Sequence, residues 1–257
     1  MRITIIGSGN VATHFSAAFK NAGHKIIQVY SPNLEHAALL AYHVKAEPID
    51  NLESISTETD IFIIAILDVQ IDFVASVLST YHKIIVHTSG ATDLATLSQY
   101  TQSSGVFYPL QTLSKNREVE FLTVPICIEG NNETITNQLL DLARSVSNKV
   151  YLVNSEQRKI LHISAVFACN FPNFLYGVAA QLLNHNNMDF EIIRPLILET
   201  AQKVQYLSPK EAQTGPAVRN DFITMDTHLK LLGENTELGN LYKVLSQLII
   251  KNQEAKH

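Results

Sequence analysis

The residues whose types and spacing most clearly suggest chemistry are two glycines near the start of the chain, in the run Gly7-Ser8-Gly9-Asn10-Val11-Ala12. Residues 2–6 before them form a β-branched run typical of a buried strand, and residues 10–22 carry apolar side chains at helical spacing. Between a strand and a helix, a G-x-G-x-x-A turn lets the backbone approach a pyrophosphate, at which the helix points free N–H groups. The sequence therefore predicts that a dinucleotide contacts Gly7, Ser8, Gly9, Asn10 and Val11. The alternative is a tight turn that binds no ligand.

The end of the second predicted strand, residues 25–30, indicates which dinucleotide binds. Cofactors that lack a 2′-phosphate are usually held there by an Asp or Glu, but this chain has Ser31-Pro32-Asn33 and no acid before Glu35. Ser31 and Asn33 can donate hydrogen bonds to a 2′-phosphate, and no carboxylate repels it. We therefore expect NADP, with NAD as the second choice. The alternative is that Ser31 and Asn33 only cap the helix that begins near Leu34.

Polar or glycine-containing loops follow three later strands: Leu67-Asp68-Val69-Gln70, His87-Thr88-Ser89-Gly90, and Tyr108-Pro109-Leu110-Gln111-Thr112. In an open parallel sheet, ligands bind outside the carboxyl ends of the strands, so these loops predict a shared cleft. The expected cofactor contacts in it are Leu67, Asp68, Thr88 and Ser89. Asp68 is equally suited to capping a helix.

The helix predicted from Ser155 onward carries a stripe of mainly polar residues. At 100° per residue, one narrow arc of its surface holds Lys159, His162, Val166, Asn170, Asn173 and Gly177. Apolar flanks predict that this helix is largely buried, and Pro172 should interrupt its backbone bonding near Ala168. One interpretation places His162 and Asn170 at the nicotinamide and substrate, with His162 as proton donor. The other is a satisfied core histidine with two interface asparagines.

A second candidate site lies in the run Thr214-Gly215-Pro216-Ala217-Val218-Arg219-Asn220-Asp221, between two predicted helices. Gly-Pro sets a fixed entry to the turn, Arg219 offers a bidentate fork for a carboxylate or phosphate, and Asp221 suits a helix cap. We therefore expect Arg219 to bind an anionic substrate group. The alternative is that Arg219 and Asp221 pair with the chain around them.

The elements that must position these residues fall into two halves. Up to Val153, strands that are apolar on both faces alternate with helical patterns, which is typical of a parallel sheet covered on both sides. After Val153 only helical patterns follow, near 155–184, 189–206, 220–232 and 236–251. The predicted fold is α/β: a Rossmann-type doubly wound parallel sheet in a dinucleotide-binding domain, residues 1–153, followed by an all-helical domain, residues 154–257.

Composition excludes several classes of protein. The 257 residues are 46% hydrophobic and 17% charged with a net charge of −5, which disfavours nucleic acid or an anionic membrane surface as a partner. Cys127 and Cys169 are too few for a disulfide framework and lack zinc-ligand spacing, so no metal is expected. The N-terminal apolar run is too short for a signal peptide, and Asn170 and Pro172 interrupt the longest apolar stretch. We expect a cytoplasmic protein that does not cross a membrane.

The chain resembles a bacterial family with a Rossmann-like NADP-oxidoreductase domain and a C-terminal helical domain of uncharacterised function. The resemblance covers essentially the whole chain and is carried by residues 7–12, 87–90, 109–112, 162–170 and 215–221. More distantly, the chain is similar to pyrroline-carboxylate reductase, prephenate dehydrogenase and the β-hydroxyacid dehydrogenases. In those families the helical domain supports a dimer and closes the active site over the nicotinamide, so the resemblance implies a homodimer.

Two positions depart from these families. Tyr108 stands where relatives often have His, and Lys159 is followed by His162 and Ile163 where the hydroxyacid dehydrogenases have a catalytic Asn. Their mechanism therefore does not carry over. The leading hypothesis is an NADP-dependent reductase or dehydrogenase that transfers a hydride between NADP(H) and a small, carboxylate-bearing metabolite. The alternative is a non-catalytic dinucleotide-binding sensor or regulatory protein on a dehydrogenase scaffold.

Overall fold

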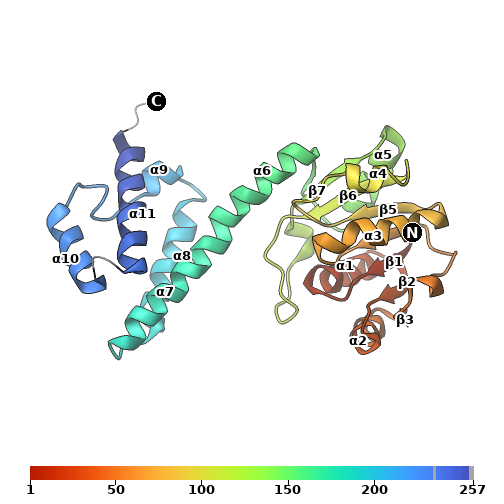
Figure 1. Ribbon diagram of the computed structural model, residues 1–257, viewed down its shortest axis with the longest axis horizontal. Helices are drawn as coiled ribbons and strands as arrows, with labels where there is room; N and C mark the ends of the chain where they lie inside the picture. Colours follow the sequence, from red (N-terminus) through yellow and green to blue (C-terminus); the bar gives the residue numbers. More distant parts are fainter. Residues whose placement is uncertain (234–235, 255–257) are drawn as a thin grey trace. The chain divides into compact units, whose positions relative to one another are not determined.

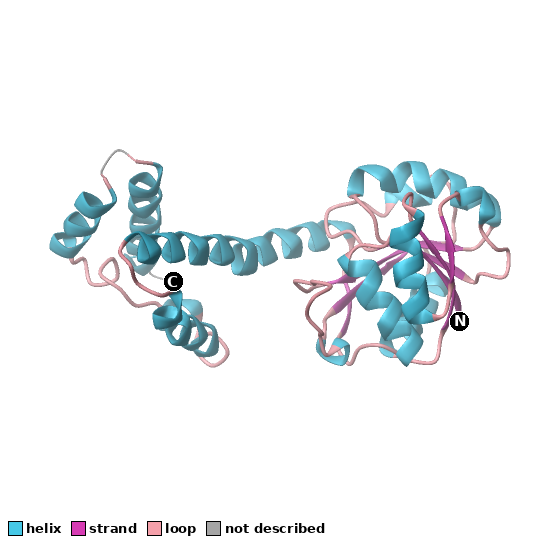
Figure 2. Cartoon of the chain, turned by 90° about the horizontal axis from the view of Figure 1, so that it is seen from below, coloured by secondary structure: helices cyan, strands magenta, loops and turns pink. Residues whose placement is uncertain are grey.

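The computed structural model describes residues 1–233 and 236–254 (Figure 1). The chain divides into two compact units, Met1–Phe174 and Leu175–His257. The first contains a sheet with helices on both faces, and the second is helical throughout its described residues (Figure 2). The predicted fold class is confirmed.

The sheet of the first unit has eight strands in the order β3-β2-β1-β4-β5-β6-β7-β8. Their bounds are β1 Arg2–Ile6, β2 Lys25–Tyr30, β3 Glu47–Ile49, β4 Ile61–Ile64, β5 Ile84–His87, β6 Ser104–Pro109, β7 Ile126–Gly130 and β8 Val150–Leu152. Neighbouring strands are parallel except β6 and β7, which are antiparallel. The sheet is therefore mostly parallel, and the antiparallel pair is a feature that the sequence did not indicate. The segment between these strands contains no α-helix to carry the chain back across a face of the sheet, so the chain turns back beside β6.

Helices cover both faces of this sheet. On one face α1 (Asn10–Asn21), α2 (Leu34–Val44) and α5 (Glu133–Arg144) share a core that includes Phe15, Leu40 and Leu139. On the other, α3 (Ile71–Leu78) and α4 (Ala95–Ser98) cover a second core. All four residues of β4 are fully buried, which explains why the strands of this sheet read as continuous apolar runs.

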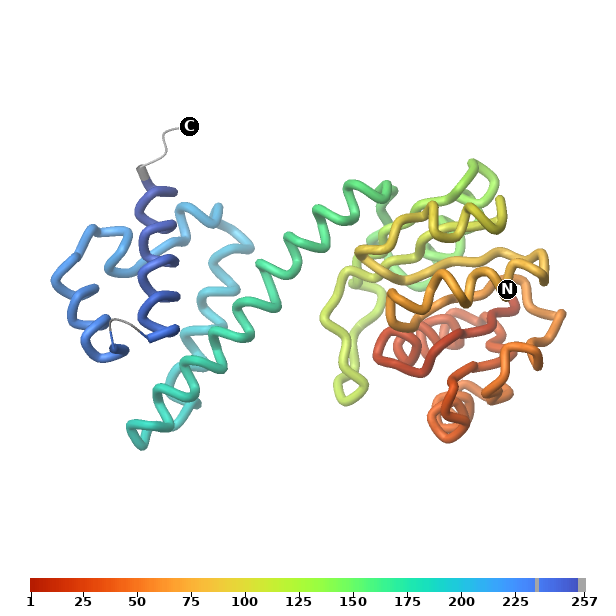
Figure 3. Tube along the Cα trace, in the orientation of Figure 1, coloured from red at the N-terminus to blue at the C-terminus, as the bar shows by residue number. Residues whose placement is uncertain are grey.

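One long helical stretch leaves the sheet after β8 (Figure 3). It consists of α6 (Ser155–Ala165), the π-helical turn η5 (Val166–Asn170) and α7 (Phe171–His185). Pro172 has no N–H to donate to the carbonyl of Ala168, and the helix widens to a π turn at that point. The predicted interruption therefore takes the form of a π turn.

The expectation that this helix is buried was wrong. Five large apolar side chains on it are about half or more exposed: Ile160, Ile163, Phe167, Phe171 and Phe174. The stretch Ser155–His185 is also long and apolar enough to cross a membrane by length and composition, and none of its apolar window is buried within the chain. An apolar sequence pattern indicates that a helix face is unfavourable to expose to water, but it does not indicate which element or molecule packs against that face.

The second unit contains α8 (Arg194–Lys203), α9 (Pro209–Ala212), α10 (Phe222–Leu232) and α11 (Glu237–Glu254). The predicted domain boundary at residues 153 and 154 falls just after the last strand ends at Leu152. The compact units part later, at Phe174 and Leu175. The start of α6 stays with the sheet because Arg158, on its second turn, is fully buried and ion-paired with Glu129 of β7.

Candidate functional site

The glycine turn after β1 has the backbone geometry that the sequence predicts. Gly7 has φ +123°, and a Cβ there would lie 2.2 Å from the carbonyl oxygen of Ala65, so only glycine fits. Gly9 has an ordinary φ of −78° and open space around it. No side chain caps α1, and its first turn has no acidic residue, so its first N–H groups are left for an anion. The residues present fit a pyrophosphate.

The predicted ribose end lies beside this turn. Ser31 is buried, and its Oγ accepts a hydrogen bond from Ser8 Oγ at 3.1 Å, which ties the ends of β1 and β2 together. Asn33 caps α2, because its Oδ1 accepts from the N–H groups of Glu35 and His36 at 2.9 and 3.3 Å. Asn33 therefore caps α2 and Ser31 does not, and the cofactor contacts of both residues stay a prediction. The side-chain amide N–H groups of Asn33 take no part in this cap.

The loops after β4 and β5 meet as predicted. Ser89 Oγ donates to Asp68 at 2.8 Å and accepts from the N–H of Thr92 at 2.9 Å. Thr88 is buried, and its hydroxyl donates to the carbonyl of Ile64 at 3.1 Å. Asp68 lies inside the short 3₁₀ helix η2 (Asp68–Gln70), whose N-cap is Leu67, so the capping alternative for Asp68 was wrong. Leu67 itself is 70% exposed at the edge of the sheet.

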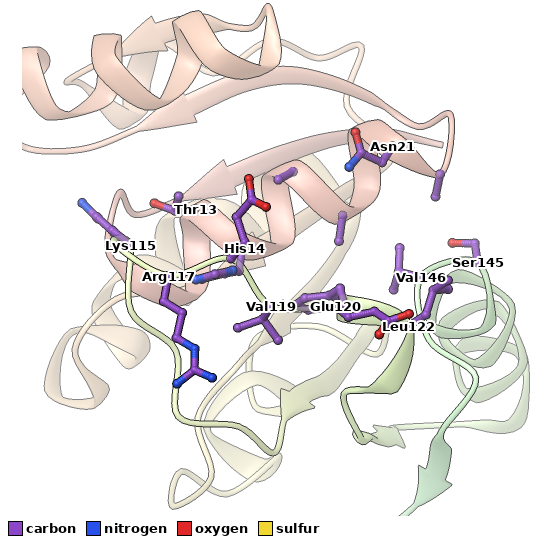
Figure 4. A pocket seen from close by; sticks show the side chains of 15 residues that line it. Thr13, His14, Asn21, Lys115, Arg117, Val119, Glu120, Leu122, Ser145 and Val146 are labelled. Atoms are coloured by element: carbon purple, nitrogen blue, oxygen red, sulfur yellow. The ribbon is translucent and has the colours of Figure 1, made fainter. Parts of the chain in front are cut away.

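A groove of about 570 Å³ runs along α1 from Thr13 to the C-terminal end of the helix (Figure 4). Its other wall is the segment between β6 and β7. That segment is tied to α1 by two hydrogen bonds, from Lys115 N–H to Asn10 Oδ1 at 3.2 Å and between His14 Nε2 and the carbonyl of Ser114 at 3.0 Å. The backbone of Lys115 therefore lies beside Asn10, the first residue of α1, and Lys115 and Arg117 both line the groove; sequence reasoning missed this wall.

A tyrosine and a histidine contact each other beside the loop that follows β5. Tyr108, near the end of β6, and His162, on α6, are joined by a 3.1 Å hydrogen bond between Oη and Nδ1, with their rings edge to face. Gly90 makes room for the pair, because a Cβ there would lie 2.7 Å from His162 Nδ1 and 2.9 Å from Tyr108 Cζ. The sequence placed Tyr108 in a loop, whereas the structure places it in β6 and gives it a partner.

Tyr108 is enclosed, and its hydroxyl keeps its proton. Burial raises the pKa of Tyr108 above its ordinary value of 10.0, although the positive charge of Arg158 opposes this shift. Cys127 lies opposite Tyr108 on β7, and burial raises the pKa of this thiol to about 11. At neutral pH Tyr108 is therefore a phenol that lies beside an uncharged thiol.

Arg158 holds the start of α6 on the sheet. Its guanidinium is fully buried, forms an ion pair with Glu129, and donates to the carbonyl of Thr92 and to Ser155 Oγ. Ser155 in turn donates to Glu129 from both its N–H and its hydroxyl, at 2.9 and 2.8 Å. Arg158 and His162 are four residues apart and share a face of α6, so this anchor positions His162. Sequence reasoning missed Arg158, although Lys159 beside it was noted.

His87, the last residue of β5, is fully buried below this cluster. Burial, followed by the charge of Arg158, lowers its pKa from 6.5 to about 3, so the ring is neutral. Its Nδ1 accepts from the N–H of Ser89 at 3.2 Å. His87 is therefore a structural support of the loop that carries Thr88 and Ser89.

The other two predicted catalytic residues are both exposed. Asn170 is exposed at the end of the π turn, and eight residues of helix separate it from His162 by about 12 Å. Arg219 is exposed in the turn before α10, in the second unit. Asp221 caps α10 by accepting from the N–H of Thr224 at 3.1 Å, as predicted. The catalytic roles of Asn170 and Arg219 stay predictions. Among residues 1–233 and 236–254, no three His, Cys, Asp or Glu side chains form a group that could hold a metal ion.

Two sequence families match the chain. Residues 2–91 match a family described as NADP oxidoreductase coenzyme F420-dependent, and residues 124–249 match a domain of unknown function, DUF2520. No curated protein matches the chain. The first match covers the glycine turn and the loops after β4 and β5, and the second covers α6 and the helical unit. The family resemblance inferred from the sequence is confirmed.

Solved structures agree with these matches. A “putative NADP oxidoreductase” from Bacteroides fragilis is 39% identical over 97% of this chain and 98% of that chain, with a TM-score of 0.92. A 1-pyrroline-5-carboxylate reductase from Streptococcus pyogenes is 16% identical over 99% of each chain, with a TM-score of 0.66. A prephenate dehydrogenase from A. aeolicus is 14% identical over 99% of this chain and 98% of that chain, with a TM-score of 0.58. The last two show a shared fold.

Substitutions at the two glycines of the turn should distinguish an effect on stability from an effect on dinucleotide affinity. Gly9→Ala meets no protein atom but replaces the N-cap of α1, so we expect the free energy of unfolding to fall by no more than about 1 kcal/mol. Its methyl group faces the predicted pyrophosphate, and dinucleotide affinity should fall about 10-fold or more. Gly7→Ala is the contrasting variant and should lose more than about 2 kcal/mol of stability. Urea denaturation and calorimetric titration measure both quantities, and unchanged affinity in Gly9→Ala would contradict the site.

His87 should make the fold sensitive to acid. The unfolded chain binds a proton at an ordinary pKa near 6.5, whereas folded His87 stays neutral down to about 3, so stability is lost as pH falls between these values. His87→Asn should flatten the dependence of the unfolding free energy on pH by up to about 1.4 kcal/mol per unit. Urea denaturation between about pH 6 and pH 4 tests this. A variant with the same slope as the wild type would show that His87 is not responsible.

Proposed function

The chain belongs to the oxidoreductase family of the Bacteroides fragilis protein, and from this premise we propose that it transfers a hydride between NADP(H) and a small, carboxylate-bearing metabolite. The observation that carries the proposal is the Gly7–Gly9 turn, which presents the uncapped start of α1 to an anion. The fold brings polar loops from β4 and β5 to the same edge of the sheet, next to Tyr108 and His162.

The cofactor is proposed to be NADP. The N–H groups at the start of α1 would hold the pyrophosphate. Ser31 and the free side-chain amide of Asn33 would face the ribose phosphate, because no acid occupies the end of β2. Bound there, the nicotinamide supplies the hydride, while the protein supplies orientation and a proton.

His162 is proposed as the proton donor to the reacting carbon–heteroatom bond. It is half-buried, is held by Tyr108, and lies beside Gly90 of the loop that follows β5. Arg219 is proposed as the fork that binds the substrate carboxylate, and Asn170 as a second substrate contact. Lys159 is ion-paired with Asp93 at 3.1 Å, which supports His162 rather than a lysine as the donor.

The experiment is a screen of NADPH oxidation with imines, keto acids and aldehydes. We expect turnover with a carboxylate-bearing member, and His162→Gln should lower kcat by about 10²- to 10⁴-fold while NADPH affinity is unchanged. Stoichiometric NADPH binding without turnover of any compound would overturn the proposal in favour of a dinucleotide sensor. Equal affinity for NADH and NADPH would contradict the role of Ser31 and Asn33.

We also propose that the apolar face of α6 and α7 packs against a second copy of the chain, which makes a cytoplasmic homodimer. The face carries Ile163 and Phe167, and its helix begins on the sheet through Arg158, which disfavours a membrane span. Phe167→Glu should shift the mass measured by light scattering toward that of a monomer. Leu39→Glu on α2 is the matched control, since the two side chains are 64–65% exposed. A monomeric wild type would contradict the proposal.

A further inference from the structure

We infer that Tyr108 is a positioning residue that holds His162 as the neutral Nε2–H tautomer and passes it the phenol proton. The inference rests on the proposed function, in which His162 is the proton donor. The tautomer is nevertheless a property of the protein without substrate, so it can be tested separately.

The geometry brings Tyr108 and His162 together from distant parts of the sequence. Tyr108 comes from β6 and His162 from α6, and Gly90 comes from the loop after β5. The 3.1 Å bond joins Oη to Nδ1, so the hydrogen bond uses the ring nitrogen nearer the backbone and leaves Nε2 for another partner. A Cβ at position 90 would collide with both rings, so the pair meets where the chain has a glycine.

The direction of the hydrogen bond follows from the surroundings. Burial keeps Tyr108 a phenol, and within the described residues its Oη has no other hydrogen-bond partner, so its proton is directed to Nδ1. A ring that accepts at Nδ1 carries its own proton on Nε2. Among the described residues His162 Nε2 has no hydrogen-bond partner either, which leaves it available to a substrate heteroatom.

This arrangement balances the proton transfer. When a hydride reaches the substrate carbon, the heteroatom gains an electron pair and takes the proton from His162 Nε2. The phenol proton of Tyr108 moves to Nδ1, so the imidazole stays neutral. Nε2 later takes a proton from water while Nδ1 returns its proton to the phenolate, which restores the starting tautomer. The charge of Arg158, which acts to lower the pKa of Tyr108, stabilises the transient phenolate. Without Tyr108, only a protonated imidazole could donate.

The second unit provides a control pair of nearly the same geometry. His228 Nδ1 and Tyr242 Oη are 2.9 Å apart, with rings edge to face, between α10 and α11. No predicted cofactor contact lies on these helices. Tyr242→Phe should therefore change the signals of His228 and leave those of His162 and the turnover rate as they were.

The experiment is ¹⁵N NMR of the full chain labelled at histidine, at mildly alkaline pH, with His162→Gln to assign the signals. We expect an unprotonated, pyridine-like Nδ1 and a protonated Nε2 for His162. In Tyr108→Phe the two frequencies should move toward each other as the tautomers mix. Gly90→Ala should cause the same change while the tyrosine hydroxyl remains. A protonated Nδ1 in the wild type, or no change in Tyr108→Phe, would overturn the inference.

Kinetics give a second readout once a substrate turns over. Wild-type kcat for reduction should stay level through the pH near 6.5 at which a free imidazole titrates. In Tyr108→Phe, kcat should fall above that pH and be about 10-fold lower at neutral pH, with NADPH affinity unchanged. Equal pH profiles would overturn the proton transfer. The predicted NMR result without turnover of any substrate would instead leave the tautomer established and the proposed function wrong.

Discussion

The buried ion pair between Arg158 and Glu129 is the interaction on which the rest of the site depends. A fully buried guanidinium cannot be left without its carboxylate, since removing one partner of such a pair costs about 3–5 kcal/mol. The pair therefore fixes α6 to β7, and its further bonds to Ser155 and Thr92 fix the rotation of the helix. His162, one turn later, is placed over Gly90 and Tyr108 as a result.

The same cation organises the protonation states around it. Arg158 acts to lower the pKa of His87, Tyr108 and Cys127, whereas burial lowers only that of His87 and raises the other two. Burial and the cation thus both lower the pKa of the histidine, whereas they shift the pKa values of the phenol and the thiol in opposite directions. At neutral pH the outcome is a neutral imidazole, a phenol and a thiol around one positive charge that is balanced by Glu129.

Local features were predictable from the sequence, and non-local pairings were not. The glycine turn and the cap at Asp221 depend on neighbours within a few residues, so residue types and periodicity were enough. The pairing of Tyr108 with His162 spans 54 residues, and that of Arg158 with Glu129 spans 29, and no local pattern marks either. The antiparallel pairing of β7 depends on the path of a long loop, and the exposure of the apolar face of α6 depends on which other elements reach it, so neither follows from a local pattern.

The contact at Gly90 has a consequence for how this family can vary. A side chain at position 90 is excluded only while both rings occupy the space beside it. The two rings can contact each other only if residue 90 has no side chain. The three positions are therefore expected to change together among relatives. In a relative with a small residue at position 108 or 162, alanine would fit at position 90. Glycine at position 90 therefore indicates which relatives have the paired rings.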